Sequence, residues 1–160
     1  MYRAVIAVID ASRARFFTFD REAGGGGIEE RMVEHTDLVN LARRMRPSEL
    51  FSETRPPSNK RGTIDDHRSD NLDNMDAAFA RTALSALRQL IDEHAPRRAI
   101  VCAAPRMLGA LRAAATNLIP DDLEVDMLAR DLVKLSPTEL RSLLAAHGLL
   151  PGGAALHAAR

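Results

Sequence analysis

The stretch RAVIAVIDASRARFFTFD, residues 3–20, decides the fold. Residues 3–9 form a nearly continuous apolar run rich in β-branched side chains, which predicts a buried strand. Asp-Ala-Ser at residues 10–12 favours a short turn. The following residues alternate, which predicts a second strand in a hairpin with the first; one face would carry Ala14, Phe16 and Thr18, and the other Arg15, Phe17 and Phe19.

The segments that follow extend this hairpin. Gly24–Gly27 favours a turn, and Ile28–His35 a third strand, so we expect an antiparallel meander. Helical spacing then predicts a short helix containing Leu38, Leu41, Ala42 and Met45. From residue 47 to residue 70 no stable period is present, and the stretch is rich in proline and serine. A structureless stretch of this length within a domain is typical of functional or disordered segments.

Helices and strands alternate in the second half of the chain. The pattern predicts a long helix from Asn71 to His94, with Asp70 as its N-cap. Strands follow at residues 99–104 and 123–129, and a helix between them starts at Pro105. The last helix has a capping box at residues 136–139, Ser-Pro-Thr-Glu, and Gly148 to close it.

This order, βββ-αβαβα, predicts an α/β fold with a ribonuclease H-like mixed sheet. Helices would pack on the sheet, and a long central loop would interrupt the chain. We therefore expect one domain over residues 1–148, with a flexible insertion at about 46–70 and a flexible tail over residues 149–160.

Composition narrows the class of protein. The chain has 160 residues, 46% of them hydrophobic, which suits a globular domain. No apolar run is long enough to span a bilayer, and the N-terminus lacks the layout of a signal peptide. A single cysteine, Cys102, fits a reducing compartment and a buried packing thiol. These features predict a cytoplasmic protein without a membrane partner.

The net charge is zero, but the charges are unevenly distributed. A basic block lies between residues 43 and 61, and five aspartates follow between residues 65 and 76. Arginine binds phosphate well because its planar fork can donate two hydrogen bonds. The candidate nucleic-acid-binding residues are therefore Arg43, Arg44, Arg46, Arg55, Lys60, Arg61 and Arg68. The alternative is a solvated loop in which these side chains pair with Glu49, Glu53, Asp65 and Asp66.

Three stretches carry a resemblance to a known family: residues 8–17 (VIDASRARFF), 103–112 (AAPRMLGALR) and 131–140 (DLVKLSPTEL). In that order they resemble the bacterial host attachment proteins, "proteins required for attachment to host cells". The resemblance implies similarity to the middle domain of archaeal and eukaryotic release factors, where a Gly-Gly-Gln loop enters the peptidyl-transferase centre. This sequence departs from that pattern, because its only glutamine is Gln89, within the long predicted helix. Release by a Gly-Gly-Gln mechanism is therefore excluded.

Other candidate sites are weaker. Arg106, at the start of a helix that follows a buried strand, is a candidate anion-binding residue. Asp10 ends the first strand, where ribonuclease H-like nucleases place a metal-binding carboxylate; Asp126 and Asp131 are its candidate companions, and a turn-forming role is the alternative. Aspartates and a histidine near the long helix also offer ligand chemistry for a divalent cation, with capping and turns as the alternative: Asp65, Asp66, His67, Asp70 and Asp73. No spacing identifies a metal or cofactor site, so we expect none.

The sequence leads to three hypotheses for the function. The first is a non-catalytic, release-factor-like module that binds the ribosome or tRNA through the basic central segment. The second is a metal-dependent hydrolase or nuclease that uses Asp10. The third is a direct role in host interaction. The sequence favours the first, and it gives no expectation for the oligomeric state.

Overall fold

One mixed β-sheet forms the centre of the molecule, with β1 (Tyr2–Ile9) in its middle. The structure is a computed structural model that describes residues 1–44 and 61–152; for residues 43, 44 and 61–72 it describes the helical backbone. The sheet order is β3-β2-β1-β5-β6, and β4 pairs with the start of β2. The other strands are β2 (Arg13–Gly24), β3 (Gly27–Glu34), β4 (Leu38–Val39), β5 (Arg98–Ala103) and β6 (Glu124–Leu128).

The sheet has an antiparallel half and a parallel half. β1, β2 and β3 form the expected meander, in which Val5 lies opposite Thr18 and Thr18 opposite Val33. β5 and β6 run parallel to β1, so a helix must cross over before each of them. This topology confirms the predicted ribonuclease H-like α/β fold.

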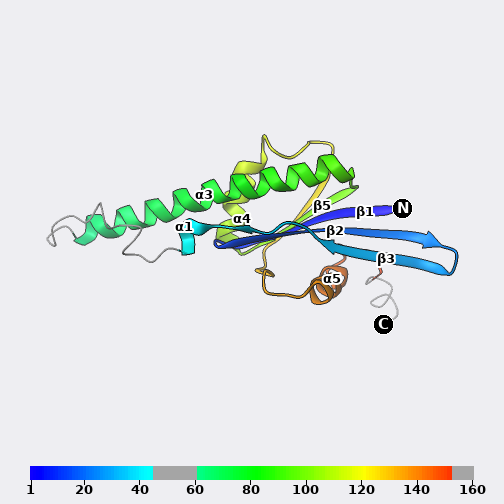
Figure 1. Ribbon diagram of the computed structural model, residues 1–160. Coiled ribbons are helices and arrows are strands. Elements are labelled where there is room, and N and C mark those ends of the chain that lie inside the picture. Colours follow the sequence, from blue (N-terminus) through cyan, green and yellow to red (C-terminus); the bar gives the residue numbers. More distant parts are fainter. Residues whose placement is uncertain (45–60, 153–160) are drawn as a thin grey trace.

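Helices cover both faces of the sheet (Figure 1). α3 (Arg61–His94) and α4 (Pro105–Ala115) pack on one face, and α5 (Pro137–Ala146) packs on the other. A short helix, α1 (Leu41–Arg44), contacts α3. No helix in the described part of the chain has the length and hydropathy needed to cross a bilayer.

The alternation of side chains along β1 and β2 explains the two layers. Val5, Ala7 and Ile9 point into the core beneath α3 and α4, whereas Ala4, Ile6 and Val8 point toward α5. On β2, Phe16 belongs to the first core, and Phe17 and Phe19 belong to the second. The continuous apolar run at residues 3–9 is therefore the strand that both cores share.

The long helix starts earlier than the sequence predicts. α3 begins at Arg61, so Asp70 lies inside the helix and does not cap it. Apolar periodicity indicates only the part of a helix that packs on a core. Among residues 73–94 of α3, the buried apolar residues begin at Phe79 and continue to Ile91. The ten residues before Asn71 lack that signal, and the predicted loop is wrong for residues 61–70.

Two further boundaries differ from the predictions. Leu38 and Val39 form a strand, because the edge of β2 at Arg13 and Ala14 offers backbone groups for pairing. Packed residues continue past the predicted domain boundary at residue 148. Leu150 is buried in the core under α5, and the Leu149 amide donates to the Leu144 carbonyl.

The ends of α5 match the sequence signals. The Glu139 amide donates to Ser136 Oγ at 3.1 Å, and the Ser136 amide donates to Glu139 Oε1 at 2.9 Å, which completes the predicted capping box. Gly148 follows the helix with φ of 75°, a conformation that glycine adopts without steric cost. The local sequence therefore determines where this helix begins and ends.

The core between the sheet and α3 can be tested with a matched pair of leucines. Leu84 on α3 is completely buried, whereas Leu41 on α1 is 73% exposed. We expect Leu84→Ala to lower the free energy of unfolding by about 3 kcal/mol, because it leaves a cavity in the core. Leu41→Ala should change it by less than about 0.5 kcal/mol. Urea denaturation of the two variants checks this, and equal losses would contradict the packing described.

Candidate functional site

The basic residues singled out in the sequence are distributed over two helices. Arg43 and Arg44 end α1, and Arg61 is the first residue of α3. Arg68 lies seven residues further along α3. Because α1 contacts α3, the fold brings backbone segments close together that the sequence separates. The remaining predicted residues, Arg46, Arg55 and Lys60, lie outside the residues that the structure describes.

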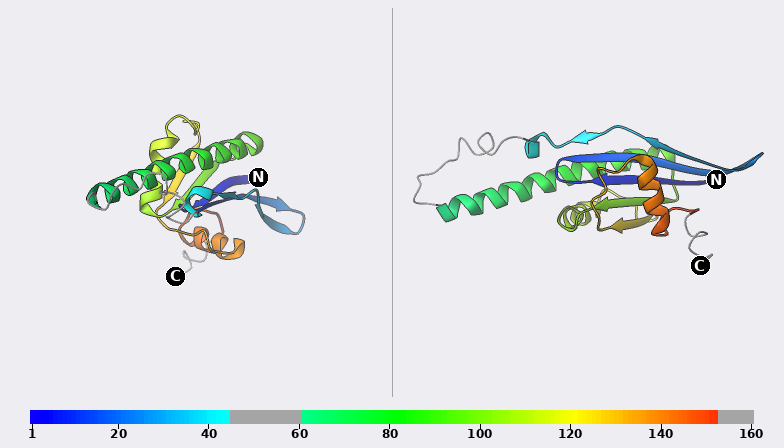
Figure 2. Two further views of the ribbon diagram at one scale, coloured as in Figure 1. Left: turned by 60° about the vertical axis from the view of Figure 1, so that its left-hand side comes forward. Right: turned by 90° about the horizontal axis from the view of Figure 1, so that it is seen from below.

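The first part of α3 projects past the sheet (Figures 1 and 2). A spacing of seven residues is two helical turns, so Arg61 and Arg68 occupy the same face of this helix. Asp65 and Asp66 lie between them in the sequence, so the projecting end carries charges of both signs. Its backbone is helical, which replaces the predicted loop for this part of the basic segment.

Arg106 is held by the neighbouring helix. Its guanidinium forms ion pairs with Asp73 and with the buried Asp76, both on α3; Nε lies 3.6 Å from Asp76 Oδ2. These carboxylates form ion pairs with the cation that the sequence suggested for binding an external anion. The pairs fasten the start of α4 to α3, and this role accounts for the charge without a ligand.

Asp10 stabilises the turn between β1 and β2. Its Oδ1 accepts hydrogen bonds from the amides of Ser12 and Arg13, both at 2.7 Å. Asp126 pairs with Arg98 at 2.9 Å, and Asp131 accepts from the Val133 amide at 3.2 Å. The three aspartates are therefore engaged separately. Within residues 1–42 and 73–152, no group of three acidic, histidine or cysteine side chains has an arrangement that could hold a metal ion.

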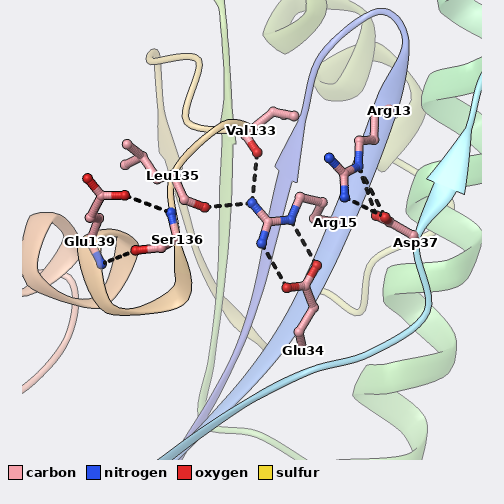
Figure 3. A network of polar contacts seen from close by, with 8 residues as sticks. All are labelled: Arg13, Arg15, Glu34, Asp37, Val133, Leu135, Ser136 and Glu139. Atoms are coloured by element: carbon pink, nitrogen blue, oxygen red, sulfur yellow. Dashed lines mark hydrogen bonds and ion pairs between the residues drawn. The ribbon is translucent and has the colours of Figure 1, made fainter.

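Sequence reasoning missed the function of Arg15. Although arginine, it is only 7% exposed and lies on the α5 face of β2 (Figure 3). Its Nη1 donates to the carbonyls of Val133 and Leu135 at 2.8 and 2.6 Å. Its Nε and Nη2 donate to the two carboxylate oxygens of Glu34 at 2.8 and 2.7 Å. The guanidinium also lies over the ring of Phe17, 5.1 Å from the centroid.

This contact joins two of the stretches that carry the family resemblance. Arg15 belongs to residues 8–17, and the carbonyls that it binds belong to residues 131–140. The capping box of α5 follows directly, so Arg15 fixes the segment from which that helix starts (Figure 3). A charged residue among the buried positions of an alternating strand was the signal that could have indicated this role.

The remaining groups of interest do not form a reactive set. Burial raises the pKa of the Cys102 thiol to about 12, which agrees with a packing role for this residue. Gln89 is an exposed residue of α3. Gly24–Gly27 form the turn between β2 and β3, at the end of the sheet opposite α1 (Figure 1). The glycine-rich turn and the only glutamine are thus unrelated to the basic segment.

The strand order and the two helical layers define a ribonuclease H-like α/β domain. The chain belongs to the family described as "Protein required for attachment to host cells", whose model matches residues 5–144. This match confirms the predicted family. A comparison with curated proteins found no match.

Three solved structures similar to this chain have low sequence identity to it. A Ppx/GppA family member from Aquifex aeolicus is 14% identical with a TM-score of 0.41, covering 79% of this chain and 35% of its own. The type II variant of the Aquifex aeolicus Ppx/GppA phosphatase is 15% identical with a TM-score of 0.44, covering 95% and 42%. Thermus thermophilus RuvC is 16% identical with a TM-score of 0.37, covering 93% and 82%. This chain thus spans less than half the length of the two Ppx/GppA proteins, and the fold assignment rests on its own strand order.

Two neighbouring arginines on β2 provide a test of the buried ion pair. Arg15→Ala leaves Glu34 and two carbonyls without their donor, so we expect a loss of about 3 kcal/mol in the free energy of unfolding. Arg13 pairs with Asp37 at the surface, and Arg13→Ala should cost less than about 1 kcal/mol. Chemical denaturation measures both. Similar losses for the two variants would contradict the assigned role of Arg15.

The same ion pair predicts a loss of stability in acid. Hydrogen bonds from Arg15 hold the pKa of the Glu34 carboxyl below its ordinary value, although partial burial opposes this shift. The unfolded chain therefore binds more protons, and the contribution of Glu34 is present above about pH 4.3 and lost as the pH falls below it. We expect the unfolding free energy of the wild type to decrease over this range. Glu34→Gln should show a weaker dependence in urea denaturation at a series of pH values; an unchanged dependence would contradict the assignment.

Proposed function

We propose that this protein is a non-catalytic, release-factor-like module that binds ribosomal or transfer RNA through its arginine-rich segment, residues 43–68. One observation carries the proposal: α1 and α3 are in contact, and the first part of α3 projects past the sheet. In the proposal, Arg43 and Arg44 on α1 and Arg61 and Arg68 on the projecting part of α3 contact different phosphates of one RNA. The proposal also includes Arg46, Arg55 and Lys60, which lie outside the residues that the structure describes.

These arginines would bind the phosphate groups of the RNA. Arginine can donate two parallel hydrogen bonds to a phosphate, and each contact releases counterions from the RNA. Binding should therefore weaken steeply with salt and depend little on base sequence. The aspartates between Arg61 and Arg68 limit the net charge of this end, so the proposal relies on local contacts and not on the charge of the whole protein.

The proposal assigns no hydrolysis to the module. Its resemblance to release-factor domains concerns the scaffold and the position of the segment before a long helix. The glutamine required for peptidyl-tRNA hydrolysis in that class has no equivalent in residues 43–68. In this proposal the protein acts in the cytoplasm, and the attachment named in the family description is an indirect consequence of RNA binding.

Cosedimentation with ribosomes and filter binding to tRNA test the proposal at about 50 and 200 mM salt. We expect binding at low salt that is largely lost at high salt. Replacing Arg43, Arg44, Arg61 and Arg68 by alanine should abolish most of it and reduce the slope of log K against log salt by about 3, since each phosphate contact contributes roughly 0.7–0.9.

A charge-matched variant provides the control. It replaces four exposed basic residues elsewhere by alanine, and so removes the same number of positive charges: Arg81, Arg97, Arg112 and Lys134. This variant should retain RNA binding. Equal loss in both variants would show that binding depends only on overall charge, and no salt-sensitive association in the wild type would reject the proposal.

A further inference from the structure

The β3 strand leaves one edge of the sheet open. It is the terminal strand in the sheet order, and among the described residues only β2 pairs with it. Figure 2 shows β3 at the outer border of the sheet, and α5 contacts this strand from one face of the sheet. Ile28 on this strand is 61% exposed.

The hydrogen-bond pattern shows which backbone groups face outward. The His35 amide donates to the Phe16 carbonyl at 2.8 Å, so the adjacent pair Phe17–Glu34 is a non-hydrogen-bonded pair. In an antiparallel ladder the two pair types alternate, so Val33, Arg31 and Glu29 bond to β2. The amide and carbonyl groups of the even-numbered residues therefore point away from the sheet: Ile28, Glu30 and Met32.

We propose that this edge pairs with β3 of a second copy of the chain in a two-fold symmetric dimer. Two adjacent antiparallel strands of one sheet can be related only by a two-fold axis perpendicular to the sheet. Such an axis leaves equivalent side chains of the two copies on the same face of the sheet. Residues that lie opposite each other must then have numbers of the same parity. This condition leaves few registers, each defined by the residue on the axis.

Only one of the central registers is complementary. With Glu30 on the axis, Ile28 lies opposite Met32 of the second copy and Glu29 lies opposite its Arg31, and symmetry repeats both pairs. With Arg31 on the axis, two Arg31 side chains meet and Ile28 faces Glu34. With Glu29 on the axis, two Glu29 side chains meet and Ile28 faces Glu30.

The Glu30-centred register also resolves the like charges on the axis. Each Glu30 carboxylate already accepts from Arg21 Nε at 3.1 Å and from Arg141 Nε at 3.0 Å. Two carboxylates would therefore meet among four guanidinium groups. Ile28 would gain an apolar neighbour, and the even-numbered residues would form about six backbone hydrogen bonds. A short edge contact of this kind gives a weak dimer that depends on protein concentration.

Sedimentation equilibrium over a series of protein concentrations tests the dimer, and charge reversal tests its register. Arg31→Glu places like charges opposite each other twice and should weaken dimerisation by about tenfold. The double variant Glu29→Arg/Arg31→Glu should restore it. Arg97→Glu makes the same charge change at an exposed position outside the edge and should have no effect. A wild-type monomer throughout the series, or a double variant as weak as the single one, would overturn the proposal.

A cysteine crosslink tests the axis independently of these charges. In the proposed register the two residues at position 30 are a hydrogen-bonded pair with Cα atoms about 5.5 Å apart, within the range that a disulfide spans. Glu30→Cys should therefore form a covalent dimer on oxidation, and Arg31→Cys should not. The native Cys102 is buried and leaves the background low. Crosslinking of Arg31→Cys as readily as Glu30→Cys would overturn the register.

Discussion

The fold depends on one charged side chain buried among apolar ones. Arg15 lies within the core strand β2, yet it satisfies its guanidinium with Glu34 and with two carbonyls from the segment before α5. Leaving a buried cation without partners costs several kcal/mol, so these groups must assemble together. The contact thereby joins the antiparallel half of the sheet to a helix formed more than a hundred residues later.

Much of the fold could be predicted because its signals are local. The apolar run at residues 3–9, the proline at 105 and the capping box at 136–139 each determine structure through neighbouring residues. The start of α3 could not be predicted in this way, since the sequence of its first turns has no apolar periodicity. The pairing of β4 and the packing of Leu150 depend on surfaces that exist only in the folded sheet.

The candidate site was harder to predict than the fold for the same reason. Basic composition identified Arg43 and Arg61, and the fold assigns them to two helices, α1 and the start of α3. Asp10 is a residue type that can bind a metal, and Arg106 is one that can bind an anion. In this fold both contact groups of the protein itself. A residue type indicates what a side chain is able to bind. Tertiary contacts decide whether that capacity is used within the protein.

The length of α3 has a consequence for any partner of its first turn. Arg61 precedes Phe79, a buried apolar residue of α3, by eighteen positions, which corresponds to about 27 Å of helix. Such a helix sets both a distance and a direction, because each residue turns the helix by about 100°. Deleting one residue between them would rotate the arginine face away from its original direction, whereas deleting seven would shorten the helix and nearly preserve that direction. Insertions or deletions in this part of α3 therefore preserve the direction of Arg61 only when they comprise about seven residues, which are two helical turns.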